Sequence, residues 1–582
     1  MNLPYTADPV AAVMVAQTAV GATLTAVMWS RPLSKKLATV LFLAAIWLAV
    51  LLPVTPALMK LLTDAPPHPD HAMWVLRVSA ALATVAMMLN GRISLVVAGV
   101  AAEIGLGRLG SYVSSSDLEL AGMHLLWFGA LIALVRRIED DASAPSPEPV
   151  RSYAREDLVM FGAAVVLAAL VAVYVLERSI DSDDEWGYTY QADLFAHGKA
   201  YAPAPPCGDA FRMFWVWFYQ GRSFAQYTPG WPLFMAPFAA VGMTWFAAPV
   251  THGLLVVGVA RLARRITAAN GSPSGQIAWS GRIAALAACT GAATLMNAGS
   301  RFPHVFVGAC FAWSIEAVCA MTSPTITPRS KWTWGVVLGL AVSFLVSSRP
   351  ADAAALEVGV LSIFAYALLR GRVGWRAFTG AALTFGIVSV VSLIILRLQM
   401  GVWFKTGYDV VSQFHPWVVL KYSVPSPSEF RFGIPLATSS YSFWPCAPAF
   451  AAAGLLNVRN EGRAIAFMLV AGSLCLAGFL TMLEFGRGMD FGYGPRYHLP
   501  HVVTMAVGAG VLLAPLFAKV EALLSTPRAF FAAGPAALVV AAMIVGVVRI
   551  APLMYPYAHD EIRHRNALFR AIKTRLKSTM RS

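Results

Sequence analysis

Apolar runs of about 17–22 residues recur along nearly the whole chain and are separated by short polar turns. A helix needs about that length to cross roughly 30 Å of hydrocarbon while keeping its backbone hydrogen bonds within itself. Membrane β-strands would instead read as segments of about 10 residues with alternating polarity, which we do not find. The pattern therefore predicts an all-α, polytopic membrane protein.

We expect about sixteen transmembrane helices, five before a polar linker and eleven after it. Besides a run that ends near residue 62 and one that follows Trp231, the spans are expected near 10–29, 74–89, 93–107, 120–135, 158–176, 281–298, 303–320, 333–348, 352–369, 377–396, 443–456, 464–483, 501–518 and 529–548.

The linker, residues 139–156, is rich in proline, serine and charge, which is typical of a segment between domains. It would separate an N-terminal membrane region (1–138), to which the sequence assigns no role, from a membrane core (157–550). A basic C-terminal tail (551–582) follows the core.

Arginine and lysine gather in short clusters between the spans, and such clusters face the cytoplasm in most membrane proteins. This places the linker inside and two long polar segments, 178–231 and 397–442, outside. We expect a multi-pass protein of the cell membrane, in bacteria the inner membrane, with juxtamembrane helices and an active site on the extracytoplasmic side. The basic tail contradicts this topology, because sixteen spans leave it outside, so a C-terminal span is the suspected miscount.

Composition supports the membrane assignment, since 58% of the 582 residues are hydrophobic and 13% are charged. The net charge of +14 is divided among the loops and does not form one basic face, so no nucleic-acid partner is predicted. The six cysteines show no metal-ligand spacing. Cys207 and Cys446 lie in or beside the outer segments, where a disulfide between them is a hypothesis.

The first outer segment opens with an acidic run, and within it Ser182 and Glu185 have the spacing of a capping box. That spacing predicts a short helix from about Asp183 to Ala196. The run has two interpretations. Its carboxylates could simply cap the helix and complement its dipole, which is worth about 1 kcal/mol, or they could carry out chemistry.

Two faces of this helix follow from its period. Trp186, Tyr190 and Leu194 form a stripe suited to the membrane interface. The second face is polar and consists of Asp184, Tyr188 and Gln191.

Four basic residues, Arg301, His304, Arg349 and Arg496, are predicted at outer ends of spans, where the positive-inside bias makes arginine unexpected. Ionisable residues at such depths are functional hypotheses by default, and together these four suggest an anionic ligand. Each could instead snorkel or pair with an acid, for which Asp352, Glu484 and Asp490 are available.

Five stretches carry a family resemblance: DEWGYTYQADLFAHGKAYAPAPP (184–206), QYTPGWPL (226–233), SSRPAD (347–352), KTGYD (405–409) and YGPRY (493–497). With these the core resembles bacterial membrane glycosyltransferases of the GT-C class. The type is family 39, which is related to protein O-mannosyltransferases and lipid A aminoarabinose transferases.

The resemblance implies transfer of a hexosyl or pentosyl group from a polyprenyl-phosphate donor to a glycan, lipid or protein acceptor, with inversion. It maps the family's Asp-Glu pair onto Asp184 and Glu185, as general base and partner or, in some members, near a divalent metal. Asp183 adds a third acid, which leaves open which aspartate is the base. Tyr497 beside Arg496 matches a later landmark and is implied to bind substrate. No cofactor is implied with certainty.

Two other classes remain open. A transporter or flippase of anionic solutes or lipid-linked molecules could line its path with Arg and Asp, although transporters more often show paired repeats with broken spans, which we do not find. A non-catalytic membrane scaffold would use the acidic run only as a cap.

Overall fold

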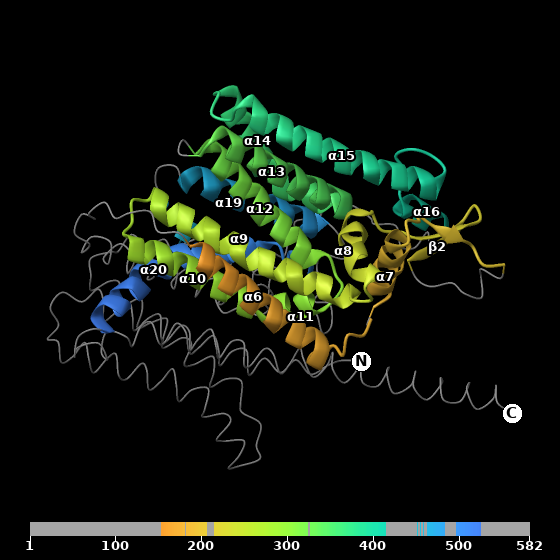
Figure 1. Cartoon of the computed structure of the whole chain (residues 1–582), viewed down its shortest axis with the longest axis horizontal. Coiled ribbons are helices and arrows are strands. Elements are labelled where there is room, and N and C mark those ends of the chain that lie inside the picture. The colour runs from red at the N-terminus through yellow and green to blue at the C-terminus, as the bar shows by residue number, and fades with distance from the viewer. Residues whose placement is uncertain are drawn as a thin grey trace, which may run out of the picture.

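The computed structural model describes residues 153–180, 182–206, 215–323, 326–414, 462–482 and 496–524, with a few positions between 451 and 458. Long helices run side by side in a bundle, and a smaller cap of short helices and strands covers one end of it (Figure 1). The predicted N-terminal region, the C-terminal tail and the two cysteines of the disulfide hypothesis lie outside the described residues.

The helices are, in chain order, α6 (Ala154–Leu170), the π-helical turn η1 (Val171–Val175), α7 (Asp183–Ala196), α8 (Gly230–Ala240), the 3-10 turn η3 (Thr244–Phe246), α9 (Ala247–Ala269), α10 (Ser274–Thr290), α11 (Ala292–Gly299), α12 (His304–Thr322), α13 (Pro328–Ser348), α14 (Pro350–Leu369), α15 (Trp375–Met400), α16 (Gly407–Phe414), α19 (Gly462–Met482), the 3-10 turn η6 (Arg496–His498) and α20 (His501–Leu524).

Within the described residues, seven helical segments are long and apolar enough to cross a membrane: Ala154–Val175, Thr244–Ala269, His304–Thr322, Pro328–Ser348, Pro350–Leu369, Trp375–Met400 and His501–Ala522. On α15 the side chains of Leu383, Ile387 and Val390 are 54–60% exposed. A row of apolar side chains pointing outward from a packed bundle is suited to hydrocarbon. The prediction of an all-α, polytopic membrane protein is confirmed.

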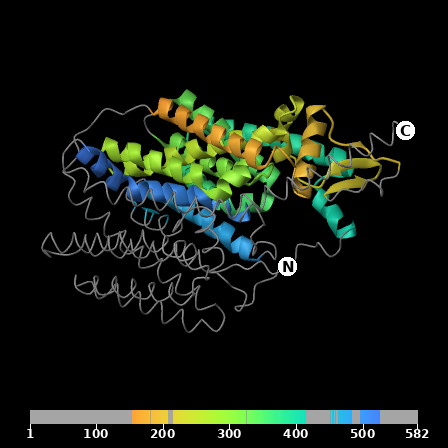
Figure 2. The same ribbon diagram turned by 90° about the horizontal axis from the view of Figure 1, so that it is seen from below.

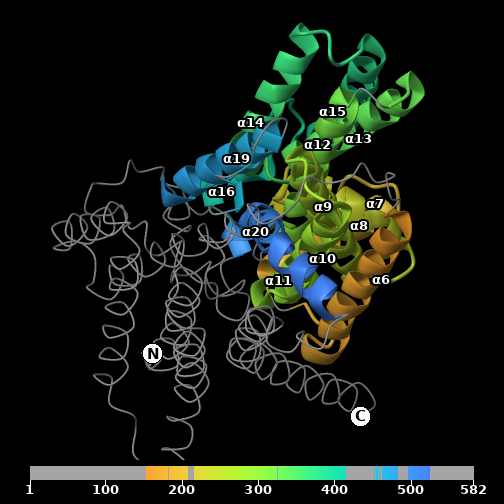
Figure 3. The ribbon, with the colours of Figure 1, turned by 90° about the vertical axis from the view of Figure 1, so that its left-hand side faces the viewer.

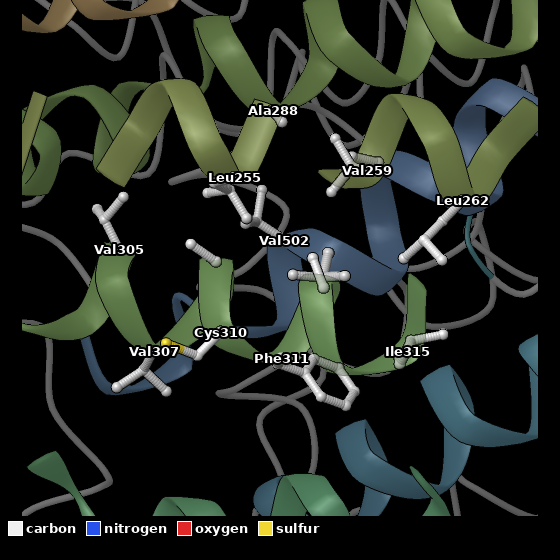
Figure 4. Close-up of a cluster of buried hydrophobic side chains, with 14 of the residues drawn as sticks. Leu255, Val259, Leu262, Ala288, Val305, Val307, Cys310, Phe311, Ile315 and Val502 are labelled. Atoms are coloured by element: carbon white, nitrogen blue, oxygen red, sulfur yellow. The ribbon is translucent and has the colours of Figure 1, made fainter. Parts of the chain in front are cut away.

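The core forms around α9, which packs against α6, α10, α12 and α20. Leu255, Val259 and Leu262 of α9 face α12, where Phe311 and Ile315 are fully buried (Figure 4). Small residues let these two helices approach closely, since a Cβ on Gly258 would come within 2.9 Å of the Ala312 methyl group. Beyond α12 the bundle continues through α13 to α15, while α14 packs on α19 (Figure 3).

One predicted span is wrong. The apolar run at 281–298 is two helices, because α10 ends at Thr290 and Gly291 adopts an extended conformation (φ −59°, ψ 127°) before α11 begins. Helix α6 begins at Ala154, within the last residues of the predicted linker.

The helices alternate in direction, so two different sets of polar residues gather at the two ends of the bundle. One end holds α7, α8, α16 and the first residues of α12, α14 and α20, and we call it the site end (Figures 1 and 2). At the opposite end, Asp157 pairs with Arg261 at 2.8 Å and with Arg264 at 2.5 Å. Glu156 joins the same network through Arg264 and Arg282.

A three-stranded antiparallel sheet, which the sequence did not predict, forms part of the cap. Its strands are β1 (Ala202–Pro203), β2 (Val216–Tyr219) and β3 (Arg222–Ala225), in the order β1-β3-β2. Tyr219 pairs with Arg222, so Gln220 (φ 50°) and Gly221 (φ 70°) make a two-residue hairpin turn of the kind that suits twisted strands.

The sheet rests on the C-terminal end of α15 through a small core of its own. Trp217, Phe224, Met400 and Val410 are buried there together. This core fixes the cap against α15 and α16 and holds the segment after β3 beside α7.

Candidate active site

The first turn of α7 is a complete capping box. The Glu185 backbone N–H donates to the Ser182 hydroxyl, and the Ser182 N–H donates to Glu185 Oε2, both at 3.2 Å. The predicted helix and cap are confirmed with the predicted bounds. For Glu185, the interpretation of the acidic run as a helix N-terminal cap is therefore confirmed.

Glu185 also ties α7 to the bundle. The side chain is buried, at 1% exposure, and its Oε1 accepts a hydrogen bond of 2.8 Å from the backbone N–H of Arg301. Both carboxylate oxygens thus bind backbone N–H groups, and a buried N–H that lost this partner would destabilise the fold. The observed role of Glu185 is to position α7 against the α11–α12 turn.

Asp184 faces a different environment. Its Oδ1 accepts a hydrogen bond of 2.6 Å from the Tyr227 hydroxyl, and its Oδ2 lies 3.1 Å from Nη2 of Arg496. The Asp184 side chain is 23% exposed, whereas Asp183 is an exposed residue on the outer side of the helix. The Asp184 carboxylate thus joins side chains from two other elements at the site end, the segment after β3 and η6.

Tyrosine rings pack beside this carboxylate. The Tyr188 and Tyr227 rings are stacked with centroids 4.1 Å apart, and Tyr408 of α16 meets the Tyr227 ring edge-on at 6.2 Å. Burial, and secondarily neighbouring groups such as Asp184, raise the pKa of Tyr188 and Tyr227 well above the usual value. Their hydroxyls are therefore neutral donors at physiological pH.

The stack requires a glycine on α7. A Cβ on Gly187 would come within 2.8 Å of the Tyr227 ring, which is closer than real Cβ atoms approach a neighbour. Similarly, a Cβ on Gly407 would meet the backbone of Gln226 at 2.3 Å, so α16 lies directly on the segment that carries Tyr227.

Arg349 and Asp352 form a second charged pair at the site end. Nε of Arg349 lies 2.5 Å from Oδ2 of Asp352, and Nη2 lies 3.4 Å from Oδ1. Burial lowers the pKa of Arg349, but the Asp352 carboxylate more than offsets it, so the pKa is raised overall. Asp352 was one of the acids proposed as a neutralising partner, and the structure shows that pairing.

Arg496 and His304 complete the cluster. The Arg496 guanidinium lies over the Phe302 ring at 4.3 Å and near the Tyr497 ring at 5.2 Å, while Arg349 is 5.1 Å from that same Tyr497 ring. His304 meets Tyr497 edge-on at 5.2 Å. It is 2% exposed, and its Nδ1 has no hydrogen-bond partner in the described part of the chain.

Gln191 of the predicted polar face and Arg301 of the four basic residues bind the protein's own backbone. Gln191 donates to the Ala200 carbonyl and accepts from the Ala225 N–H, both at 3.0 Å, which fastens α7 to β3. The Arg301 guanidinium donates to the carbonyls of Ser179 and Arg178 and so holds the segment between η1 and α7. Their polar atoms hold the scaffold of the site.

The predicted interfacial stripe of α7 is only partly exposed. Trp186 is 43% exposed, but Leu194 is buried and the Tyr190 hydroxyl donates to Ser223 of β3 at 2.8 Å. The three-stranded sheet, which the sequence did not predict, therefore covers the stripe over most of its length.

Two residues of the cluster were missed as site residues, Tyr227 and Tyr408. Both lie inside stretches that carry the family resemblance, 226–233 and 405–409, and that position was the available signal. Sequence spacing could not place them, because Tyr227 meets Asp184, and Tyr408 meets Tyr227, only after the chain has folded back.

The two acids proposed as metal ligands do not fit a metal ion. Both oxygens of Glu185 accept from backbone N–H groups, and both oxygens of Asp184 are engaged by Tyr227 and Arg496. An ion would have to displace these partners. The described residues contain no cluster of three His, Cys, Asp or Glu side chains that could hold one.

No protein-family model and no curated protein matches the chain. Among solved structures it is similar to ArnT from Cupriavidus metallidurans. The undecaprenyl-phosphate complex has 15% identity and a TM-score of 0.44 over 71% of this chain and 79% of that one. The apo state has 16% identity and a TM-score of 0.40 over 71% and 76%.

A further similar structure is the Archaeoglobus fulgidus oligosaccharyltransferase tethered to an acceptor peptide, with 12% identity and a TM-score of 0.42 over 70% of this chain and 56% of that one. At identities and TM-scores this low, reaction and substrate must be argued from this chain's own residues.

Proposed function

We propose that this protein is a membrane glycosyltransferase that moves a sugar from a polyprenyl-phosphate donor to the hydroxyl group of a glycan, lipid or protein acceptor. The observation that carries the proposal is the Asp184 carboxylate, held between Tyr227 and Arg496 at the site end of a membrane bundle. The family resemblance of the same stretches supports it.

The chemistry asks for a base and for cations near a leaving phosphate. The acceptor oxygen forms a bond to the anomeric carbon while its proton passes to Asp184. The bond from that carbon to the phosphate oxygen breaks, and the phosphate leaves with the electron pair as the polyprenyl phosphate. A carboxylate positioned to take the proton contributes about 10²–10⁴ in rate, and fixed cations stabilise the phosphate charge.

Arg349, Arg496 and His304 are the groups we assign to the donor headgroup. They come from three separate elements, the α13–α14 junction, η6 and α12, and all contact Tyr497 or lie beside it. Planar guanidinium groups match phosphate oxygens with two parallel bonds. Because the cluster lies where the spans end, the prenyl chain can stay in the bilayer while its headgroup reaches Asp184.

We place this end on the extracytoplasmic side of the cell membrane. The support is the distribution of loop charge: the α14–α15 turn at the opposite end carries Arg370 and Arg372, and Arg376 follows in the first turn of α15, the bias expected of a cytoplasmic face.

The test uses purified protein in nanodiscs with a panel of radiolabelled polyprenyl-phosphate sugars and candidate acceptors. Transfer by the wild type, lost in Asp184→Asn and kept in Asp193→Asn, is the expected result. Asp193 is the matched control because it is an exposed carboxylate farther along α7, paired with His197 at 3.9 Å. Movement of label across a vesicle membrane without a new glycosidic bond would establish a transporter. Absence of transfer by the wild type, together with an Asp184→Asn variant that keeps the wild-type phenotype and binding, would favour a scaffold.

A further inference from the structure

The two arginine–aspartate pairs at the site end are built differently. Arg349 and Asp352 lie one helical turn apart, and two nitrogens of the arginine face two oxygens of the aspartate. Arg496 and Asp184 come from η6 and α7, and Nη2 of Arg496 lies 3.1 Å from Oδ2 of Asp184. The first pair is local and bidentate, whereas the second bridges two distant parts of the chain.

This difference decides which arginine can change partner. Asp352 is 1% exposed, so removing Arg349 from it would leave a buried, unpaired charge, at a high energetic cost. The Asp184 side chain is 23% exposed, and its other oxygen keeps the Tyr227 hydrogen bond if Arg496 moves away. Separating Arg496 from Asp184 is therefore the less costly change.

A phosphate competes well for Arg496, because it offers two oxygens to the guanidinium fork where Asp184 offers one. The rings of Phe302 and Tyr497 lie beside the guanidinium at 4.3 and 5.2 Å and limit the directions in which it can turn. The neighbouring cation is Arg349, which faces the same Tyr497 ring.

We propose that Arg496 exchanges partners, binding Asp184 when the site holds no donor and the donor phosphate when it does, so that donor binding releases Oδ2 of Asp184 for the acceptor hydroxyl. The inference rests on the proposed function, since it takes the anion to be the donor's phosphate. It makes Oδ2 of Asp184 available only when a prenyl phosphate is bound.

The exchange has an unusual consequence for binding: the carboxylate competes with the donor for Arg496. Asp184→Asn should therefore bind a prenyl phosphate more tightly than the wild type does, by about fivefold, the change that a competing ion pair worth ~1 kcal/mol produces. Removing the negative charge of Asp184 would by itself favour binding of an anion. The control is therefore the same substitution in a protein that lacks Arg496.

The experiment is a double-mutant cycle with geranylgeranyl phosphate, a sugar-free probe, in nanodiscs of phosphatidylcholine, whose headgroups carry no net charge. Dissociation constants are measured for the wild type, Asp184→Asn, Arg496→Gln and the double variant. The expected result is a gain in affinity from Asp184→Asn that disappears in the Arg496→Gln background. Should Arg496→Gln fail to fold, Arg496→Met, which keeps an apolar stem between the rings, takes its place.

An equal gain in both backgrounds would overturn the exchange, since Asp184 would then act on the anion through its charge alone. No gain in the Arg496-containing protein would overturn it as well. The probe carries no sugar, so the cycle is independent of turnover. Failure of the proposed function would appear separately, as absence of product with every donor of the panel.

Discussion

The Tyr227 hydroxyl lies 2.6 Å from Oδ1 of Asp184, and the Tyr227 ring stacks on Tyr188 at 4.1 Å. Both of these partners belong to α7. One tyrosine therefore both orients the proposed base and fixes the face of α7 on which it lies. The segment after β3 and the first turn of α7 act as a unit.

Tyr227→Phe should keep the stacked ring and lose the hydrogen bond. A positioning bond of this kind is worth about 1.4 kcal/mol, so we expect kcat to fall about tenfold with little change in Tm or in the KM for donor. Steady-state rates give kcat and KM, and thermal melting gives Tm. A large fall in Tm with normal kcat in the folded protein would mean that the hydroxyl serves stability.

Asp184→Asn should lower the transfer rate by about 10²–10⁴, while Asp183→Asn should stay near wild type because Asp183 is exposed. Single-turnover rates at saturating donor give the comparison. If Asp183→Asn were the inactive variant, Asp183 and not Asp184 would be the base.

Glu185→Ala should act on stability. It leaves the N–H groups of Ser182 and Arg301 without their carboxylate partner, at a cost of about 2–4 kcal/mol for the lost cap and the unsatisfied buried donors. Denaturation of the detergent-solubilised protein measures the loss. A variant that melts like the wild type yet transfers no sugar would instead identify Glu185 as a catalytic residue or metal ligand.

Arg349→Ala should weaken donor binding and also destabilise the fold, because Asp352 is left buried and unpaired, which costs about 3–5 kcal/mol. Arg349→Lys should restore part of the donor affinity, because it supplies a charge without the planar fork.

Adding Asp352→Asn to Arg349→Ala separates the two effects. The double variant should recover most of the Tm and none of the donor affinity. Recovery of both would show that Arg349 is a structural partner of Asp352 and does not bind phosphate.

The orientation of the bundle can be tested on described residues. Lys405→Cys, at the site end after α15, should react in whole cells with a thiol reagent that does not cross the membrane, and Arg372→Cys, in the α14–α15 turn, should react only after permeabilisation. A version without native cysteines provides the background. Reaction of both positions in whole cells would contradict the predicted topology.

The sequence by itself determined the membrane class, most of the described spans and α7 with its cap. Span length depends on the thickness of the bilayer and the cap on residues three apart, so both are local properties that periodicity reveals. The wrong span at 281–298 has a local cause too, because a single extended glycine interrupts an apolar run without lowering its hydropathy.

The site was decided by tertiary structure. From the sequence, the resemblance makes Asp184 the general base and Glu185 its partner, with Asp183 as a third acid, and Arg301, Arg349 and Arg496 are three arginines predicted at outer ends of spans. Folding sends Glu185 and Arg301 to backbone groups and leaves Asp184 with Arg496. Those partners come from segments far apart in the chain, and which of them meet depends on the packing of whole helices, which no local pattern encodes.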